Sequence, residues 1–243
     1  IIRARRLCDA VGARGELVLT GSPSARHVAL AFGWTVHEGG AALEALTPDL
    51  VVVDDPSPQR VAAWVAHAHR LELPVVVVED GRALCRGASL VVDGHIAARP
   101  LDSPSRVSGP GFALIDPRVA VVRRHPHRRT RVLVTLGGGV HVQRFGRAVA
   151  EAVVRAMPDV LVDITTGFVS GQLPSLPAGC RWIHAPRGLS DVLSRAAVAV
   201  VAGGVTLQEA CAAGCPSVAV AVVPAQRPAV RAAALYGAVR DGG

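Results

Sequence analysis

The sequence predicts an α/β protein of two Rossmann-like domains, each built on a parallel sheet, with a cleft between them. Half of the 243 residues are hydrophobic, which is enough for a sizeable core. Short runs of β-branched residues alternate with helical segments, a pattern typical of parallel strands buried on both faces. The alternation stops at one basic segment and then starts again, so two such sets are expected.

In the first half, LVVV at 50–53 and VVVV at 75–78 are continuous apolar runs, as in buried strands. We expect strands over 16–20, 34–37, 50–53, 75–78 and 89–92, and helices over 1–14, 24–31, 40–46 and 58–71.

Residues 123–130 contain arginines and histidines around Pro126 and are expected to form the linker. The predicted domains are therefore 1–122 and 131–243. In the second, we expect strands over 131–136, 160–165, 181–184, 198–202 and 217–222, and helices over 143–156, 189–195, 206–213 and 226–236.

Both ends of the chain depart from a complete doubly wound pattern. The first helix has no strand before it, although such sheets usually start with their central strand. We therefore expect a strand and a glycine loop before Ile1. After the last helix the chain closes on Asp241, Gly242 and Gly243, where no further element is expected.

Composition excludes several classes of function. The net charge is +7, all 26 basic residues are arginine, and no lysine is present, which excludes a P-loop lysine or a Schiff-base lysine. Eight aromatic residues, none interleaved with the arginines, offer no stacking platform for nucleic acid. We expect no nucleic-acid partner and attribute the arginines to codon bias.

Other patterns point to a cytoplasmic protein without a membrane span. No apolar run reaches about 18 residues, and no signal peptide is visible. The five scattered cysteines indicate no disulfide framework. No histidine lies in a metal-ligand or Ser-His-Asp pattern, so we expect neither a metal nor a cofactor.

Two glycine loops in the second half can carry nucleotide chemistry. The strand at 132–136 leads into Gly137, Gly138 and Gly139, and the strand at 198–202 leads into Gly203 and Gly204. Glycine allows the backbone to approach a phosphate, which the N–H groups of the following helix attract. The simpler alternative for each loop is an ordinary tight turn.

Polar residues next to the second loop extend this hypothesis. Thr206 can contact a phosphate, and Glu209 can accept hydrogen bonds from the two ribose hydroxyls. T-x-x-E is also a capping box, so Glu209 can instead cap the helix that begins at Thr206. Gln226 and Arg227 follow the last strand and are candidates for substrate binding, with a plain loop as the alternative.

Acidic residues follow two strands of the first half, at Asp54-Asp55 and Glu79-Asp80. Ligands bind at the carboxyl ends of strands in open α/β sheets, so these carboxylates can orient a sugar or tune a base. The alternative is turn chemistry, for which aspartate is well suited. A divalent metal between them lacks a histidine at ligand spacing.

Taken together, these segments resemble one family, UDP-2,4-diacetamido-2,4,6-trideoxy-β-L-altropyranose hydrolase of pseudaminic acid biosynthesis. The resemblance spans nearly the whole chain and is strongest from residue 109 onward. It rests on GPGFALIDPRV, VLVTLGGG, SDVLSRAAVAVVAGGVTLQEACAAGCPSVAVAV and PAQRPAVRAAALYGAV. This family adopts the two-domain GT-B fold, shared with the glycosyltransferase that makes lipid II.

The resemblance implies hydrolysis of a UDP-activated amino-deoxy sugar without a metal. A histidine activates water, which attacks the anomeric carbon and releases UDP. UDP is implied to lie at Gly137–Gly139 and Gly203–Thr206, with its ribose on Glu209. The catalytic histidine belongs to a G-x-G-H-x-x-R pattern whose arginine matches Arg3, which places the histidine before Ile1. Asp54, Asp80 and Arg3 are therefore candidates only for supporting roles.

Three departures from the family bear on the substrate. Asp55 stands where the family often has tyrosine, Val205 where it has serine, and Ala225 where it has the asparagine of an Asn-Gln pair. Nucleotide binding transfers better than the identity of the sugar. Two alternatives therefore stay open, a GT-B glycosyltransferase that uses a nucleotide-sugar donor and a nucleotide-binding pseudoenzyme.

Overall fold

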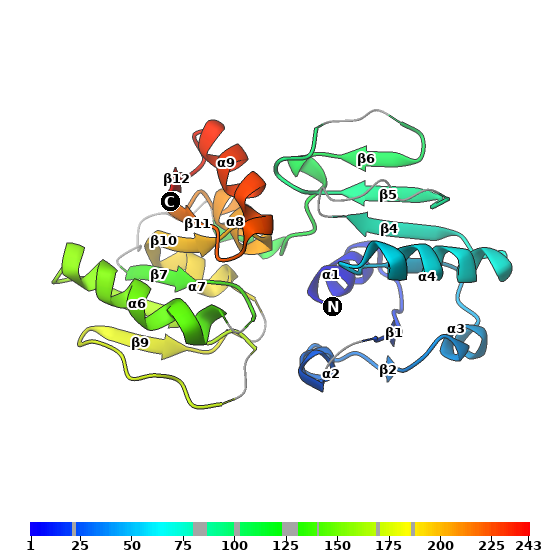
Figure 1. Ribbon diagram of the computed structural model, residues 1–243, viewed down its shortest axis with the longest axis horizontal. Helices are drawn as coiled ribbons and strands as arrows, with labels where there is room; N and C mark the ends of the chain where they lie inside the picture. Colours follow the sequence, from blue (N-terminus) through cyan, green and yellow to red (C-terminus); the bar gives the residue numbers. More distant parts are fainter. Residues whose placement is uncertain are drawn as a thin grey trace. The chain divides into compact units, whose positions relative to one another are not determined.

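A computed structural model describes residues 1–20, 23–79, 87–99, 103–122, 131–139, 141–168, 171–185 and 188–243. Its contacts divide the chain into two compact units, Ile1–Leu114 and Ile115–Gly243 (Figure 1). Segment 123–130 lies outside the described residues, so its role as a linker stays a prediction. The division falls ahead of it because the helix over Arg118–Val122 packs against helices of the second unit.

The second unit has one continuous parallel sheet. Its elements in chain order are α5 (Arg118–Val122), β7 (Arg131–Thr135), α6 (His141–Ala156), β8 (Leu161–Thr165), β9 (Cys180–Ile183), α7 (Ser190–Arg195), β10 (Ala196–Ala202), α8 (Val205–Ala212), β11 (Ser217–Val220), the 3₁₀ helix η3 (Pro224–Gln226), α9 (Arg227–Leu235) and β12 (Arg240–Asp241).

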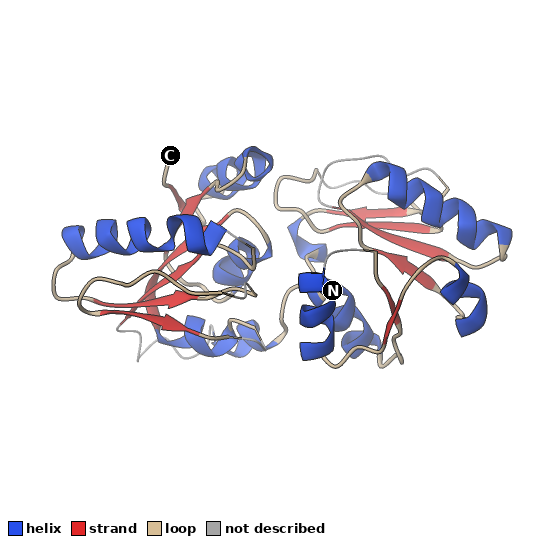
Figure 2. Cartoon of the chain, turned by 60° about the horizontal axis from the view of Figure 1, so that its bottom comes forward, coloured by secondary structure: helices blue, strands red, loops and turns tan. Residues whose placement is uncertain are grey.

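The strands of this sheet lie in the order β12-β11-β10-β7-β8-β9, and every neighbouring pair is parallel. Numbered along the chain from β7, this is the 3-2-1-4-5-6 order of a dinucleotide-binding fold. Helices cover both faces of the sheet (Figure 2).

Residues Val132–Thr135 of β7 are all buried, as the continuous apolar run predicts. Alternate side chains of a strand point to opposite faces. Val132 and Val134 join a core cluster with Val142 of α6. The opposite face is covered by α7, which contacts β7 and β10.

The first unit has two parallel sheets among its described residues. Its elements are α1 (Ile2–Val11), β1 (Leu17–Val18), α2 (Pro23–Ala31), β2 (Val36–His37), α3 (Ala41–Leu46), β3 (Val51–Val53), α4 (Pro58–Arg70), β4 (Val75–Glu79), β5 (Leu90–Asp93), β6 (Arg106–Ser108) and the 3₁₀ helix η1 (Pro110–Phe112). Strand β1 pairs with β2, and the larger sheet has the order β3-β4-β5-β6.

The core of the first unit lies between this larger sheet and α4. Val61, Val65 and Ala68 of α4 are buried against Val75 and Val77 of β4. The predicted α/β class with parallel sheets is therefore confirmed.

One expectation about the chain's end is wrong. We expected no element after the last helix, but β12 pairs with β11 through Val218↔Arg240 and Ala219↔Asp241. Arg240 and Asp241 are exposed and polar, so backbone pairing at the sheet edge defines this strand and no hydrophobic pattern announces it. No helix in the described part of the chain has the length and apolar character needed to span a membrane.

Candidate functional site

The strand order of the second unit reverses between β7 and β10. The chain continues from β7 to β8 on one side and from β10 to β11 on the other. The two strands are direct neighbours, with Thr135 paired to Val201, so the loops that follow them leave the same edge. Such a reversal at the carboxyl ends of parallel strands creates a crevice where ligands bind.

The first glycine loop lies at this reversal. Gly137 has φ +88°, a left-handed conformation that glycine adopts without a Cβ clash. A Cβ on Gly138 would lie 2.5 Å from Phe168 Cδ2, and the Gly138 carbonyl accepts the Phe168 N–H at 3.0 Å. The loop after β8 therefore rests on this glycine loop. Gly138 and Gly139 are exposed.

The second glycine loop is fixed by its neighbours. Gly203 is buried, and a Cβ there would lie 2.8 Å from Val230 Cγ2 and 3.0 Å from the Gln226 Cβ. Gln226 in turn accepts the Val222 N–H on its Oε1 at 3.0 Å. The structure thus brings Gln226 against the loop. Arg227 is exposed and is the first residue of α9.

The helix after this loop begins earlier than expected. Gly204 is the N-cap of α8, with no side-chain capping hydrogen bond, and Thr206 is the second residue of the helix. The capping-box interpretation of Thr206 and Glu209 is therefore wrong, because a capping box needs the threonine at the N-cap. The first N–H groups of a helix lack intrahelical acceptors, so those of Val205 and Thr206 lie at the helix start beside the strand-order reversal.

Glu209 lies one turn into α8 and is 3% exposed. Its Oε1 accepts a hydrogen bond from the Asp116 backbone N–H at 3.4 Å. A buried carboxylate needs such partners.

Asp116 and Arg118 form an ion pair next to Glu209. The Arg118 guanidinium donates to both Asp116 carboxylate oxygens, with Nη2 to Oδ2 at 2.6 Å. The hydrogen bond to Asp116 raises the pKa of Arg118, and the charges of Asp191 and Glu209 act in the same direction while burial opposes them. Neither residue could be predicted as a neighbour of Glu209 from the sequence, because both lie far from it along the chain.

Further polar residues at this edge were also missed. Thr165 ends β8, is buried, and its hydroxyl has no hydrogen-bond partner among the described residues. Thr166 follows it, and its Oγ1 lies 3.1 Å from Nδ1 of His184, the residue after β9. The rule that ligands bind at strand carboxyl ends, applied to β8 and β9, would have found them.

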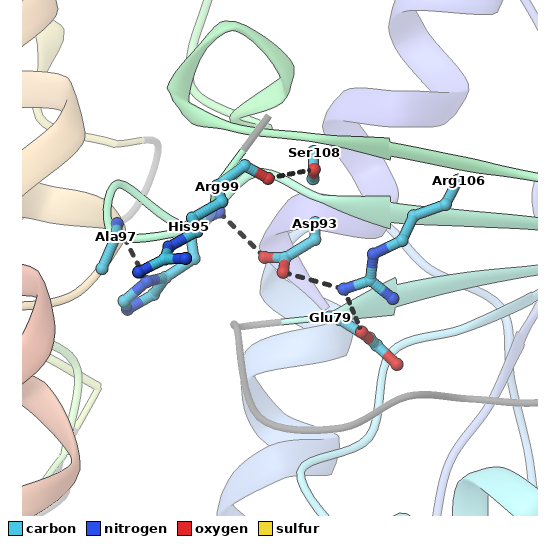
Figure 3. Close-up of polar contacts among 7 residues, drawn as sticks. All are labelled: Glu79, Asp93, His95, Ala97, Arg99, Arg106 and Ser108. Carbon is cyan, nitrogen blue, oxygen red and sulfur yellow. Dashed lines mark hydrogen bonds and ion pairs between the residues drawn. The ribbon is translucent and has the colours of Figure 1, made fainter. Parts of the chain in front are cut away.

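The first unit holds a buried ionic cluster at its own sheet edge (Figure 3). Arg106 Nη2 donates to Glu79 Oε2 at 2.9 Å and to Asp93 Oδ2 at 3.1 Å. Asp93 Oδ1 also accepts the His95 N–H at 3.2 Å. Glu79 and Asp93 end β4 and β5, so this pairing joins three strands and fixes the loop after β5. Arg106 and Asp93 had not been predicted here.

The other candidate carboxylates of the first unit have separate roles. Asp54, which follows β3, pairs with Arg3 of α1 through its Oδ1 and through its Oδ2, which lies 3.3 Å from the Arg3 Nε. Asp55 accepts the Ser57 N–H at 2.7 Å and Arg60 Nε at 2.8 Å, which confirms its turn role. Asp80 lies outside the described residues. Within the described ranges, histidine, cysteine, aspartate and glutamate form no group of three or more that could hold a metal ion.

No protein-family model matches the chain, and no curated protein matches it in sequence. Solved structures resemble its fold. A glycosyltransferase of Streptomyces sp. SF2575, SsfS6, complexed with thymidine diphosphate, has a TM-score of 0.66 at 14% identity, covering 99% of this chain and 82% of its own. MurG of Acinetobacter baumannii has a TM-score of 0.58 at 15% identity, covering 99% and 80%.

An enzyme of a different kind has a similar fold. A putative UDP-N-acetylglucosamine 2-epimerase of Listeria monocytogenes has a TM-score of 0.56 at 12% identity, covering 98% of this chain and 80% of its own. At these identities the likeness shows the fold alone. The chain has a GT-B-like fold.

Proposed function

We propose that the chain binds a nucleotide sugar on its second unit and cleaves the bond between sugar and diphosphate. The nucleotide would lie at the carboxyl edge of the sheet, where β7 and β10 are neighbours. The observation that supports this most strongly is the reversal of strand order between two glycine loops. Nucleotide binding at a switch point of this kind is common in doubly wound sheets.

The roles of the residues follow from their placement. The exposed backbone of Gly138 and Gly139 and the α8 start at Gly204 and Thr206 are suited to the diphosphate, because backbone N–H groups attract anions there. Glu209 would accept the ribose hydroxyls. Gln226 and Arg227, which follow β11, would contact the phosphates or the sugar.

For the reaction, we propose attack of water on the anomeric carbon of a UDP-activated amino-deoxy sugar, with UDP as the leaving group. The support is the sequence resemblance to the UDP-sugar hydrolase family. That resemblance places the general base before Ile1. Arg3 and Asp54, which pair with each other, stay candidates for a supporting role.

Glycosyl transfer is a second candidate, favoured by the fold likeness to SsfS6 and MurG. In transfer, a hydroxyl of an acceptor attacks the anomeric carbon in place of water, and the nucleotide site is the same. The two reactions differ in one property that can be measured, the need for an acceptor.

Calorimetric titration with UDP, thymidine diphosphate, ADP, GDP and UMP tests the binding step. We expect UDP to bind, and UMP to bind at least about tenfold more weakly, a loss of about 1.4 kcal/mol, because it lacks one phosphate. If none of the diphosphates binds, nucleotide-sugar chemistry is ruled out for this chain.

Release of UDP from UDP-sugars tests the reaction. Release in water alone indicates hydrolysis, whereas release that requires an added acceptor indicates transfer. Because the resemblance places the general base before Ile1, turnover is measured on a protein that includes the residues preceding Ile1. Binding of UDP by that protein without turnover of any UDP-sugar would contradict both reactions and support the pseudoenzyme alternative.

A further inference from the structure

The segment that precedes α5 holds Asp116 in a fixed orientation. Its carboxylate, 5% exposed, accepts the Arg118 backbone N–H at 2.9 Å and the Arg118 guanidinium Nε at 3.0 Å. Its carbonyl accepts the Val119 N–H at 3.1 Å. Charge-assisted bidentate pairs add geometric restraint as well as energy. The side chain and the carbonyl of Asp116 are thus both restrained.

The remaining backbone group of Asp116 is directed at Glu209. Its N–H donates to Glu209 Oε1 at 3.4 Å, across 93 positions of sequence. The bond is long and therefore weak. We expect it to affect the orientation of the Glu209 carboxylate more than the affinity for a nucleotide. Because α5 packs against α8, the helix that carries Glu209, the two groups are held together.

Charge adds to this arrangement. Arg118 lies close enough to Asp191 and Glu209 for both to raise its pKa, after the larger effect of Asp116. Its side chain is 54% exposed, so it borders solvent beside a carboxylate that is almost fully buried. One arginine therefore restrains the donor to Glu209 and partly compensates its charge.

We infer that the Asp116–Arg118 pair positions the Glu209 carboxylate to recognise the ribose, so that preference for ribonucleotides over 2′-deoxyribonucleotides depends on it. This inference rests on the proposed nucleotide site. Asp116 and Arg118 are positioning residues that act through Glu209. Without the guanidinium, the segment before α5 is less restrained and the carboxylate loses its fixed direction.

The test measures the ratio of the dissociation constants for 2′-deoxy-UDP and UDP by calorimetry on the full chain. Five variants are compared with the original chain: Arg118→Gln, Arg118→Lys, Glu209→Gln, the double variant of Arg118→Gln with Glu209→Gln, and Arg147→Gln. Arg147 is the matched control, because it is 53% exposed and pairs with Glu151 at 2.7 Å on α6. Arg118→Lys keeps the charge without the bidentate geometry and serves as a second variant.

We expect a ratio of about ten in the original chain and in Arg147→Gln, and about one in Glu209→Gln. Arg118→Gln should lower the ratio about threefold, and Arg118→Lys should rescue it only in part. Because Arg118 acts through Glu209, the double variant should have the ratio of Glu209→Gln alone, a non-additive result.

Three results would overturn the inference while leaving nucleotide binding intact. The first is an Arg118→Gln variant whose ratio of dissociation constants equals that of the original chain. The second is a double variant whose ratio is lower than that of Glu209→Gln. The third is an original chain that binds 2′-deoxy-UDP and UDP equally well. Failure of the original chain to bind UDP is a different result. It removes the proposed function, and the inference falls with it.

Discussion

Gly203 and Gly204 are adjacent in the second glycine loop but have different surroundings. A Cβ on Gly203 would meet Val230 Cγ2 at 2.8 Å and the Gln226 backbone oxygen at 3.0 Å, whereas Gly204 has nothing within 4 Å. Gly203 is therefore a packing position, whereas Gly204 is exposed at the start of α8, where we propose that a phosphate binds.

Replacing each glycine with alanine should separate these roles. We predict that Gly203→Ala lowers the free energy of unfolding by about 1–3 kcal/mol, because the added methyl overpacks the loop. Gly204→Ala should lower the free energy of unfolding by only about 0.5 kcal/mol. Urea unfolding of the two variants gives both values. Equal losses would show that the contacts at Gly203 do not constrain the loop.

At the residue scale, local pattern could indicate Glu209 but not its surroundings. A strand, a glycine pair and a helix follow one another along the chain, so the place of Glu209 near the sheet edge could be predicted. Asp116 is 93 positions away and meets Glu209 only through tertiary packing. The same holds for Arg106, which joins Glu79 to Asp93. No periodicity announces such contacts.

At the scale of elements, Asp163 of β8 joins three neighbouring strands. It accepts Arg131 Nε of β7 and Arg181 Nε of β9, each at 2.7 Å, and is almost fully buried. Burial alone would raise the pKa of Asp163, but the hydrogen bonds from Arg181 and Arg131 outweigh it and lower the pKa below its ordinary value. The ionised form is thus favoured by folding.

The pH dependence follows from the sign of this shift. A lowered pKa contributes stability above the unfolded value of about 3.9, and this contribution is lost as pH falls through the folded value. We predict that Asp163→Asn costs about 3 kcal/mol at pH 7, because it leaves the partly buried Arg131 without its countercharge. The cost should shrink below about pH 4.

Urea unfolding of the original chain and the variant at pH 7 and pH 3 measures both values. Asp9→Asn is the control, because its pair with Arg5 is exposed and should contribute less than about 1 kcal/mol. A cost for Asp163→Asn that is the same at both pH values would show that the ionised carboxylate is not what joins the strands.

Elements with a hydrophobic signal could be predicted, and elements without one could not. The apolar runs at β7 and β10 indicated buried parallel strands, which the structure confirms. β6 and β12 are short and carry arginine, so ion pairing or backbone pairing at a sheet edge defines them. The order of the strands in the sheet could not be predicted from the sequence pattern either, although the candidate site is located by the point where that order reverses.

At the scale of the whole molecule, we propose that the nucleotide binds the second of the two compact units. We predict that saturating UDP slows hydrogen exchange of backbone amides in 137–139 and 203–209. Amides of β3 and β4 in the first unit should change less, because the nucleotide makes its main contacts elsewhere. Mass spectrometry of peptides from the full chain measures this. Protection confined to Ile1–Leu114 would contradict the assignment.

The structure also shows what part of the arginine content does. The sequence alone left codon bias as its explanation. In the structure, many arginines are paired with carboxylates within the chain, including buried pairs at Asp93 and Asp163. Part of the basic character is therefore used for joining strands.

We propose that Glu209 holds the ribose of a nucleotide at the carboxyl edge of the sheet, where β7 and β10 are neighbours. Calorimetric titration of UDP into the original chain, Glu209→Gln and Glu151→Gln tests it most directly, since Glu151 is a glutamate on α6 that pairs only with surface residues in the described contacts. We predict at least about tenfold weaker binding for Glu209→Gln, a loss of about 1.4 kcal/mol, and no change for Glu151→Gln. Equal affinity of all three proteins for UDP would contradict the claim.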